Sequence, residues 1–352
     1  MKTAQPITFT ADAANALSVV LQNTDYDKLF VLTDETTHEL CLGRLEECKA
    51  VELAGKITIS PTDVNKNIES LSQVWQSLGE GGASRRSLLV NLGGGMVTDL
   101  GGFAASTFKR GVKFVNVPTT LLAMVDASVG GKTGINFNGL KNEIGVFNNA
   151  VEVIIDTHFL STLDRDNLVS GYAEMIKHGL ISNTQDWAEL LNFDLNDVCL
   201  DRLSELLRKN IGVKERIVAE DPMEKGLRKA LNVGHTAGHA FESFAMSEGR
   251  PVLHGFAVAW GIICELYLSV VKLGFPKDKM RQTVTFIREH FGNFAFTCDD
   301  YETLYRLMTH DKKNTEGYIN FTLLGDIGDI RLNQSASKEE IFEMLDFFRE
   351  QF

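Results

Sequence analysis

The chain changes its secondary-structure pattern near residue 160, and that change limits the folds open to it. Before this point, short runs rich in β-branched residues, such as KLFVLT (28–33), SLLVNLGGG (87–95) and VEVIID (151–156), alternate with segments of helical periodicity. Such alternation is typical of βα units around a mostly parallel sheet. Beyond it, long amphipathic stretches predict helices and almost no strands. We therefore expect an α/β domain over residues 1–160 and an all-α domain over residues 161–352.

Composition and charge narrow the classes of partner. With 44% hydrophobic and 23% charged residues, the chain has the composition of a globular protein. Its formal net charge of −12 argues against a nucleic-acid partner, because such binding draws its affinity from Lys and Arg on phosphates. Any anion must then be met by a local cluster of cations. No signal peptide or uncharged membrane span is predicted, and the five cysteines form no C-x-x-C pair. We expect a cytoplasmic protein with reduced thiols and no membrane partner.

Two glycine-containing turns follow strands in the first half. The stretch LLVNLGGGMVTDLGGFAAS (88–106) runs from a strand into a glycine triplet and then Asp99. Glycines between a strand and a helix let the backbone approach a pyrophosphate, whose charge faces free N–H groups. The spacing is not G-x-G-x-x-G, so a tight turn with close helix packing is the alternative. In VPTTLLAMVDASVGGKTG (117–134), hydroxyl residues with Asp126 and Lys132 suit a polyol or phosphate ligand.

One glutamate and two histidines in the second half form a candidate metal site. Glu174 lies in SGYAEMIKHG, His235 in NVGHTAGHAFE and His254 in VLHGFAVAWG. One carboxylate and two imidazoles are a ligand set of catalytic zinc, with a position left for water or substrate. Taken singly, such residues are more often surface or hydrogen-bonded side chains. His235 and His239 also have the spacing of the metalloprotease motif H-E-x-x-H, but Thr236 stands where that motif has its glutamate.

Long stretches of the chain resemble the 3-dehydroquinate synthase family. The resemblance covers about residues 25–325 and is carried by GGGMVTDLGGFAASTFKRGVKFVNVPTTLLAMVDASVGGKTGINFNGLKN, AEMIKHG, KGLRKALNVGHTAGHAFE, LHG and HDKKN. Two places depart from the family pattern. In SPTDVNKN, Asp63 stands where the family usually has glutamate, although Lys66 is kept, and Thr36 stands where asparagine is common. Both changes concern the adenosine side of NAD.

The resemblance implies an NAD-binding N-terminal domain, a helical C-terminal domain that binds metal and substrate, and a homodimer. It implies a divalent metal, zinc in the first place and cobalt as the alternative, held by Glu174, His235 and His254. The implied NAD contacts are Asp34, Asp63, Lys66, Gly94, Gly95, Asp99, Thr119, Thr120, Leu122, Lys132, Lys141, Phe159 and Thr162. The implied substrate and catalytic residues are Asp126, Lys132, Lys141, Asn142, Lys177, Lys214, Arg228, Asn232, His239 and one lysine of the pair Lys312 and Lys313. Arg110 is expected to reach the phosphate bound by the neighbouring subunit.

The implied reaction converts 3-deoxy-D-arabino-heptulosonate 7-phosphate to 3-dehydroquinate and phosphate, a step of the shikimate pathway. NAD takes a hydride from C5, phosphate leaves by β-elimination, the hydride returns, and an intramolecular aldol reaction closes the ring. A fourth protein ligand would close the position that the substrate hydroxyls need, so His239 is expected to act as a general base instead.

Three alternatives remain at this point. Another sugar-phosphate cyclase would share the NAD and metal residues but need no partner for a substrate carboxylate. A metal- and NAD-dependent polyol dehydrogenase would have no use for the phosphate cluster. A non-catalytic binding module of the same fold would need none of the metal ligands.

Overall fold

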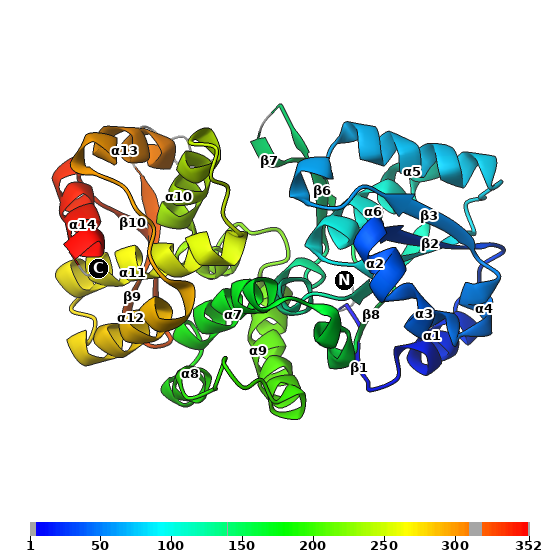
Figure 1. Cartoon of the computed structure of the whole chain (residues 1–352), viewed down its shortest axis with the longest axis horizontal. Helices are drawn as coiled ribbons and strands as arrows, with labels where there is room; N and C mark the ends of the chain where they lie inside the picture. The colour runs from blue at the N-terminus through cyan, green and yellow to red at the C-terminus, as the bar shows by residue number, and fades with distance from the viewer. Residues whose placement is uncertain (1–4, 139, 310–318, 351–352) are drawn as a thin grey trace. The chain divides into compact units, whose positions relative to one another are not determined.

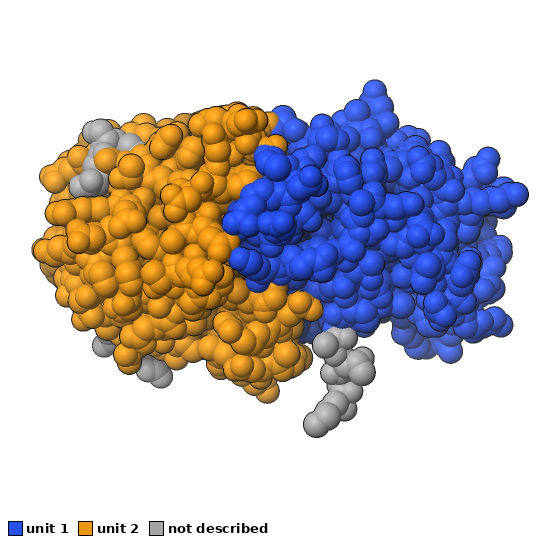
Figure 2. All heavy atoms as spheres, turned by 90° about the horizontal axis from the view of Figure 1, so that it is seen from below, with its two compact units in different colours: residues 1–164, 199–211 blue, residues 165–198, 212–352 orange. Residues whose placement is uncertain are grey.

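The computed structural model describes residues 5–138, 140–309 and 319–350. The chain divides into two compact units, coloured blue and orange in Figure 2. Unit 1 comprises residues 1–164 and 199–211, and unit 2 comprises residues 165–198 and 212–352. The helix α9 (Leu200–Glu220) is therefore shared, because its first half is counted with unit 1.

Unit 1 is built on a six-stranded parallel sheet with the order β1-β8-β5-β4-β2-β3 (Figure 1). Both β2 and β4 are buried along their whole length, as expected for parallel strands covered on both faces. The sheet confirms the predicted α/β fold of the first half. Its strands are β1 (Ile7–Phe9), β2 (Leu29–Asp34), β3 (Gly55–Ile59), β4 (Leu88–Gly93), β5 (Lys113–Pro118) and β8 (Glu152–Ile155).

Helices pack on this sheet, and an antiparallel hairpin packs on one of them, α6. Helix α6 packs on β2, β4 and β5, and α1 packs on β8. The α-helices are α1 (Ala13–Gln22), α2 (Glu35–Leu40), α3 (Leu42–Glu46), α4 (Lys49–Glu52), α5 (Ile68–Glu80) and α6 (Gly95–Thr107). The shorter helical turns are η1 (Asp63–Asn65), η2 (Phe108–Arg110), η3 (Ala123–Ala127) and η4 (Thr157–Thr162). The antiparallel hairpin consists of β6 (Lys132–Phe137) and β7 (Leu140–Phe147).

Unit 2 is mainly helical, as predicted for the second half. Besides the rest of α9, its α-helices are α7 (Arg165–Leu180), α8 (Thr184–Leu191), α10 (His235–Ser247), α11 (His254–Leu273), α12 (Lys277–Phe291), α13 (Tyr301–Thr309) and α14 (Lys338–Glu350). Its short turns are η5 (Leu227–Asn232) and η6 (Cys298–Asp300).

The expectation of an all-α second half needs one correction. An antiparallel hairpin of β9 (Asn320–Asp326) and β10 (Asp329–Ser335) lies between α13 and α14. Gly328 has φ 80°, which permits the two-residue turn that joins the strands. The centre of β9 is buried and packs against α11, so tertiary contact rather than a long alternating pattern defines this strand.

Helix α11 forms the centre of unit 2. Among the described residues it is the one helix whose length and apolar composition would allow it to cross a membrane. However, 67% of its apolar 18-residue stretch is buried inside the protein. It packs against α7, α10, α12, α14 and β9. It also carries Glu265, which is 1% exposed and hydrogen-bonded to the start of α10. These contacts are those of a core helix.

Candidate active site

In unit 1, the predicted cofactor residues lie at the carboxyl ends of the parallel strands. Asp34 ends β2, Gly94 follows β4, and Thr119 follows β5. Because β4 lies between β2 and β5, these strand ends are neighbours. In open α/β sheets this edge is where ligands bind.

The glycine turn after β4 combines close packing with a helix start that no side chain caps. A Cβ at Gly94 would lie 3.0 Å from Cγ2 of Thr120, and the N–H of Thr119 donates to the carbonyl of Gly93 at 3.0 Å. The two turns predicted from the sequence therefore pack on each other. Gly94 is also the N-cap of α6 and has no capping side chain. Both interpretations of this glycine run, tight packing and room for an anion, are compatible with its geometry.

The hydroxyl of Thr119 is buried and makes no close hydrogen bond in the described part of the chain, and its one neighbour of this kind is the thiol of Cys41, whose pKa it lowers. A thiol is a weak partner for a buried hydroxyl, and a bound ligand would satisfy this hydroxyl more fully. Nearby, Sγ of Cys41 lies 3.6 Å from Oγ1 of Thr162. Burial raises the pKa of the Cys41 thiol, and the carboxylate of Asp34 adds to that effect. Cys41 was not predicted as a site residue, because only the tertiary fold brings it beside these strand ends.

Several predicted cofactor and substrate residues form a network within unit 1. Lys66 pairs with Asp99 and donates a hydrogen bond to Oδ1 of Asn142. Nζ of Lys141 lies 3.2 Å from Oδ2 of Asp63. Burial raises the pKa of Asp99, although Lys66 opposes it. Burial acts on Asp63 in the same direction, but Lys141 and Lys66 lower its pKa below the usual value. The network ties the β6–β7 hairpin to η1 and α6.

The other predicted residues of unit 1 are described by their position and burial rather than by this network. Asp126 lies in η3, close enough to Asp99 for its charge to raise the pKa of that carboxyl group. Lys132 begins β6 and is exposed, whereas Phe159 is buried in η4. Leu122 directly precedes η3 and is half-buried. Lys312 and Lys313 lie outside the described residues.

Arg110 occupies an exposed turn between α6 and β5. Lys109, Arg110 and Gly111 have φ values of 49°, 71° and 113°, so three consecutive residues have positive φ. Such a conformation is uncommon for residues other than glycine and costs on the order of 1–3 kcal/mol per residue. Backbone hydrogen bonds hold the turn in place, from Gly111 to Phe108 and from Val112 to Ala105.

In unit 2, helices α10 and α11 bring the histidines together. Gly234 has φ 80° and lets the chain turn directly into α10, whose first residue is His235. Glu265 of α11 supplies the cap that Gly234 lacks: its carboxylate accepts hydrogen bonds from the N–H groups of Gly234 at 2.7 Å and Thr236 at 3.0 Å. His254 is likewise the first residue of its helix, α11.

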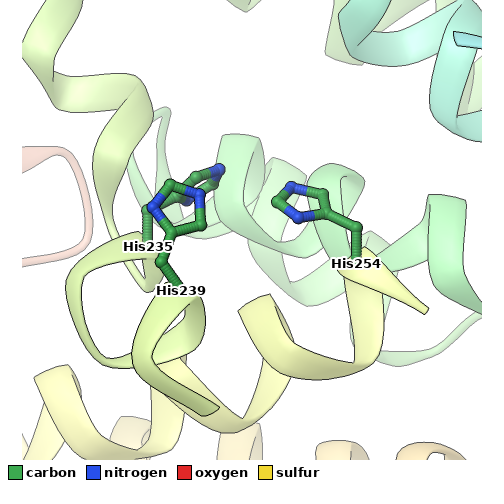
Figure 3. A group of neighbouring side chains, drawn as sticks. All are labelled: His235, His239 and His254. Carbon is green, nitrogen blue, oxygen red and sulfur yellow. The ribbon is translucent and has the colours of Figure 1, made fainter. Parts of the chain in front are cut away.

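Glu174 of α7 is fully buried beside these histidines. Its Oε1 lies 3.6 Å from Nε2 of His235 and 3.5 Å from Nε2 of His254, and its Oε2 pairs with Lys177. The ring of His239 lies with the other two, at centroid distances of 5.3 Å from His235 and 5.8 Å from His254 (Figure 3). One ring nitrogen of each histidine lies within 4.8 Å of the others. Glu174 and His239 are thus both near enough to complete a set with His235 and His254.

In His235 and His254, the ring nitrogen that faces away from Glu174 lies near a hydrogen-bond acceptor. Nδ1 of His235 lies 3.1 Å from the carbonyl of Val233, and Nδ1 of His254 lies 3.4 Å from Oε2 of Glu242. When each Nδ1 carries the proton and donates it to its acceptor, each Nε2 has a lone pair that faces Glu174. Metal-binding histidines are generally oriented in this way.

Electrostatics differ between the two histidines. Burial and the charge of Lys177 lower the pKa of His235 well below the usual value, so this ring is neutral, as a metal ligand must be. Burial also acts to lower the pKa of His254, but the carboxylates of Glu242 and Glu174 outweigh it and raise that pKa to about 10. A cation beside Glu174 would compete with this proton. The donor set of one carboxylate and two imidazoles fits a zinc-type divalent metal.

Unit 2 also buries three of the cations that were predicted to meet the substrate. Lys177, Lys214 and Arg228 are 1%, 4% and 1% exposed. Nη1 of Arg228 donates to the carbonyl of Pro222 at 2.8 Å. Asn232 ends η5, two residues before Gly234, so it adjoins the start of α10 along the chain.

Sequence comparison identifies the family. Models described as 3-dehydroquinate synthase N-terminal and 3-dehydroquinate synthase C-terminal match residues 56–170 and 171–314. A 3-dehydroquinate synthase from Parabacteroides distasonis is 55% identical over 348 residues, which cover 99% of each chain. The chain belongs to the 3-dehydroquinate synthase family. The resemblance predicted from the sequence motifs is therefore confirmed.

Solved structures share the fold. The 2-epi-5-epi-valiolone synthase from Streptomyces hygroscopicus, with NAD+ and Zn2+ bound, has a TM-score of 0.88 at 23% identity and covers 100% of this chain and 98% of that one. A 2-deoxy-scyllo-inosose synthase complexed with carbaglucose-6-phosphate, NAD+ and Co2+ has a TM-score of 0.85 at 22% identity, with coverage of 98% and 96%. These likenesses confirm the fold predicted for this 3-dehydroquinate synthase family member.

Proposed function

We propose that the protein is a 3-dehydroquinate synthase that converts 3-deoxy-D-arabino-heptulosonate 7-phosphate to 3-dehydroquinate and phosphate in the shikimate pathway. The observation that carries the proposal is the 55% identity to a relative of this name over nearly the full length of both chains. The elimination of phosphate makes the enzyme a carbon–oxygen lyase, and we place it in the cytoplasm as a homodimer.

NAD is proposed to bind at the carboxyl ends of the sheet in unit 1. Support comes from the start of α6 at Gly94, which no side chain caps, and from the buried hydroxyl of Thr119, which makes no close hydrogen bond. Asp34, Thr120 and Thr162 belong to the same strand ends or the turns after them. Lys66, Asp63 and Lys141 are assigned to the same cofactor, and their ion pairs tie the hairpin to η1 and α6.

A divalent cation, zinc or cobalt, is proposed to bind Glu174, His235 and His254. Both Nε2 atoms face the same oxygen of Glu174, and a carboxylate supplies the negative charge that a divalent ion requires. When bound, the metal acts as a Lewis acid on the substrate hydroxyls and NAD supplies the reversible oxidation at C5. His239, beside this set, is assigned to accept the proton of the C5 hydroxyl on its imidazole nitrogen.

The remaining polar residues are assigned to substrate binding. Solvent screens the charges of the buried cations Lys177, Lys214 and Arg228 less than those of exposed ones, which strengthens their attraction for a carboxylate or phosphate. The set is Asp126, Lys132, Asn142, Lys177, Lys214, Arg228, Asn232 and one of Lys312 and Lys313, with Arg110 acting in the site of the neighbouring subunit. Their share of the reaction is orientation and charge neutralisation, which can be worth on the order of 7–11 kcal/mol when reacting groups are well placed.

Phosphate release tests the function. The protein is supplied with the heptulosonate phosphate and a catalytic amount of NAD, and inorganic phosphate, 3-dehydroquinate and NADH are measured. We expect phosphate and 3-dehydroquinate in equal amounts without net NADH. Comparable phosphate release from sedoheptulose 7-phosphate would instead indicate another sugar-phosphate cyclase. Accumulation of NADH with a polyol would indicate a dehydrogenase.

Metal content tests the roles of the histidines. We expect His235→Ala and Glu174→Ala to lose the metal, because each removes one of three ligands. His239→Ala is expected to keep metal while turnover falls by about 10²–10⁴, the usual range for a lost general base. Loss of metal from His239→Ala would make this residue a ligand, and full activity would remove it from the chemistry.

A further inference from the structure

A second glutamate lies next to the proposed metal site. Glu242 is 5% exposed and lies on α10, seven residues after His235, so the two side chains share a face of that helix. Its Oε2 is 3.4 Å from Nδ1 of His254, the ring nitrogen that faces away from Glu174. The carboxylate therefore connects α10 to a side chain at the first residue of α11.

The backbone of His254 is fixed independently of this contact. The N–H of the next residue, Gly255, donates to Oγ of Ser170 in α7 at 3.1 Å. A side chain on Gly255 would overlap the carbonyl of Ser170, so α7 and the start of α11 are in close contact. With its backbone held, the imidazole of His254 retains rotation about its side-chain bonds. A fixed acceptor on Nδ1 removes that freedom and selects which nitrogen faces Glu174.

We infer that Glu242 is a positioning residue for the metal ligand His254: its carboxylate holds Nδ1–H and thereby directs Nε2 towards the oxygen of Glu174. The inference rests on the metal site of the proposed function. An anionic acceptor on Nδ1 also makes Nε2 a stronger electron donor, so its effect reaches the metal through the ring without direct contact. Such partners of metal-binding histidines typically change metal affinity by about 10- to 100-fold.

The experiment compares three variants of the full chain with the wild type. Glu242→Ala removes the acceptor, and Glu242→Gln keeps an oxygen of similar position without the charge. Glu248→Gln is the matched control, since Glu248 lies at the exposed end of the same helix. The dissociation constant for zinc is measured by competition with a chromophoric chelator, together with the Tm of the metal-free proteins and the visible spectrum of the cobalt-loaded ones.

We expect the Kd for zinc to rise about 10- to 100-fold in Glu242→Ala and by less in Glu242→Gln, with no change in Glu248→Gln. The cobalt spectrum should change in the two Glu242 variants alone. A role in packing alone would lower the Tm of the metal-free protein and leave Kd and spectrum unchanged, and that result would overturn the inference. If Glu242→Ala does not fold, the Kd of Glu242→Gln decides in the same way. A wild type that binds no zinc would instead overturn the metal site itself.

Discussion

Replacing Gly261 by alanine should separate α10 from α11 at the point where the metal site begins. A Cβ at Gly261 would overlap the carbonyl oxygen of Gly234 and lie 2.6 Å from the amide nitrogen of Gly238. Both are backbone atoms of the segment that starts α10 and carries His235 and His239. No side-chain rotation relieves this overlap, so the helices themselves must move.

The expected change in the free energy of unfolding of Gly261→Ala is the sum of two opposing effects. Overpacking a core costs typically 1–3 kcal/mol, and contact with backbone places Gly261→Ala near the upper end, at about 3 kcal/mol. Alanine is better than glycine in a helix by about 1 kcal/mol, so the net loss is about 2 kcal/mol. Gly212 in α9 is the control, because a Cβ there meets nothing within 4 Å. Gly212→Ala should therefore gain about 1 kcal/mol from the same change of residue.

Thermal unfolding distinguishes the two variants. For a unit of roughly 150–250 residues, each kcal/mol shifts Tm by about 2–4 °C. We expect Gly261→Ala to unfold about 4–8 °C below the wild type and to bind zinc more weakly, since His235 moves with α10. Gly212→Ala should unfold about 2–4 °C above it. If Gly261→Ala were as stable as Gly212→Ala, the close approach of α10 and α11 would not affect stability, and the reasoning would be refuted.

Two further predictions concern unit 1. In Lys66→Met, the partly buried carboxylate of Asp99 loses its cation, a change that costs up to about 3 kcal/mol when the carboxylate is ionised. Because burial already raises the pKa of Asp99, the stability deficit should be absent below the usual carboxyl pKa of about 3.9 and grow as the pH rises; a Tm difference that stays constant from about pH 4 to pH 8 would contradict this. Inactive Arg110→Ala and Lys132→Ala chains, mixed in equal amounts and allowed to exchange subunits, should recover about one quarter of wild-type activity, because about half of the dimers are then hybrids and one of the two sites in each hybrid has both residues. Hybrids confirmed by mass without any recovery would place Arg110 outside the neighbouring site.

Local sequence patterns were sufficient for most of unit 1. The apolar runs KLFVLT and SLLVNLGGG became β2 and β4, and the glycine run became the turn into α6, because short-range periodicity and glycine placement determine these features. The hairpin of β9 and β10 was missed. Its buried part is only Phe321–Leu324, and a short apolar run of this kind does not by itself distinguish a strand from a helix.

The proposed metal residues were predictable, but the groups that support them were not. Glu174, His235, His239 and His254 stand in distinctive motifs, and the structure brings all four together in unit 2. Glu265 reaches its hydrogen-bond partner across 31 positions of the chain, so no local pattern marks it. The same applies to Glu242, Cys41 and the pairing of Asp63 with Lys141. Such contacts depend on how helices and strands pack, which periodicity does not encode.

The three proposed ligands come from three different helices, and two of them are the first residues of their helices. A metal held there would act as a cross-link that closes the chain between α7 and α10 and again between α10 and α11. Since only the folded chain presents these ligands together, free metal at about 1,000 times its Kd would add about 4.1 kcal/mol to the free energy of unfolding. The amount of intact enzyme in a cell would then follow the supply of metal, quite apart from the activity that the metal confers.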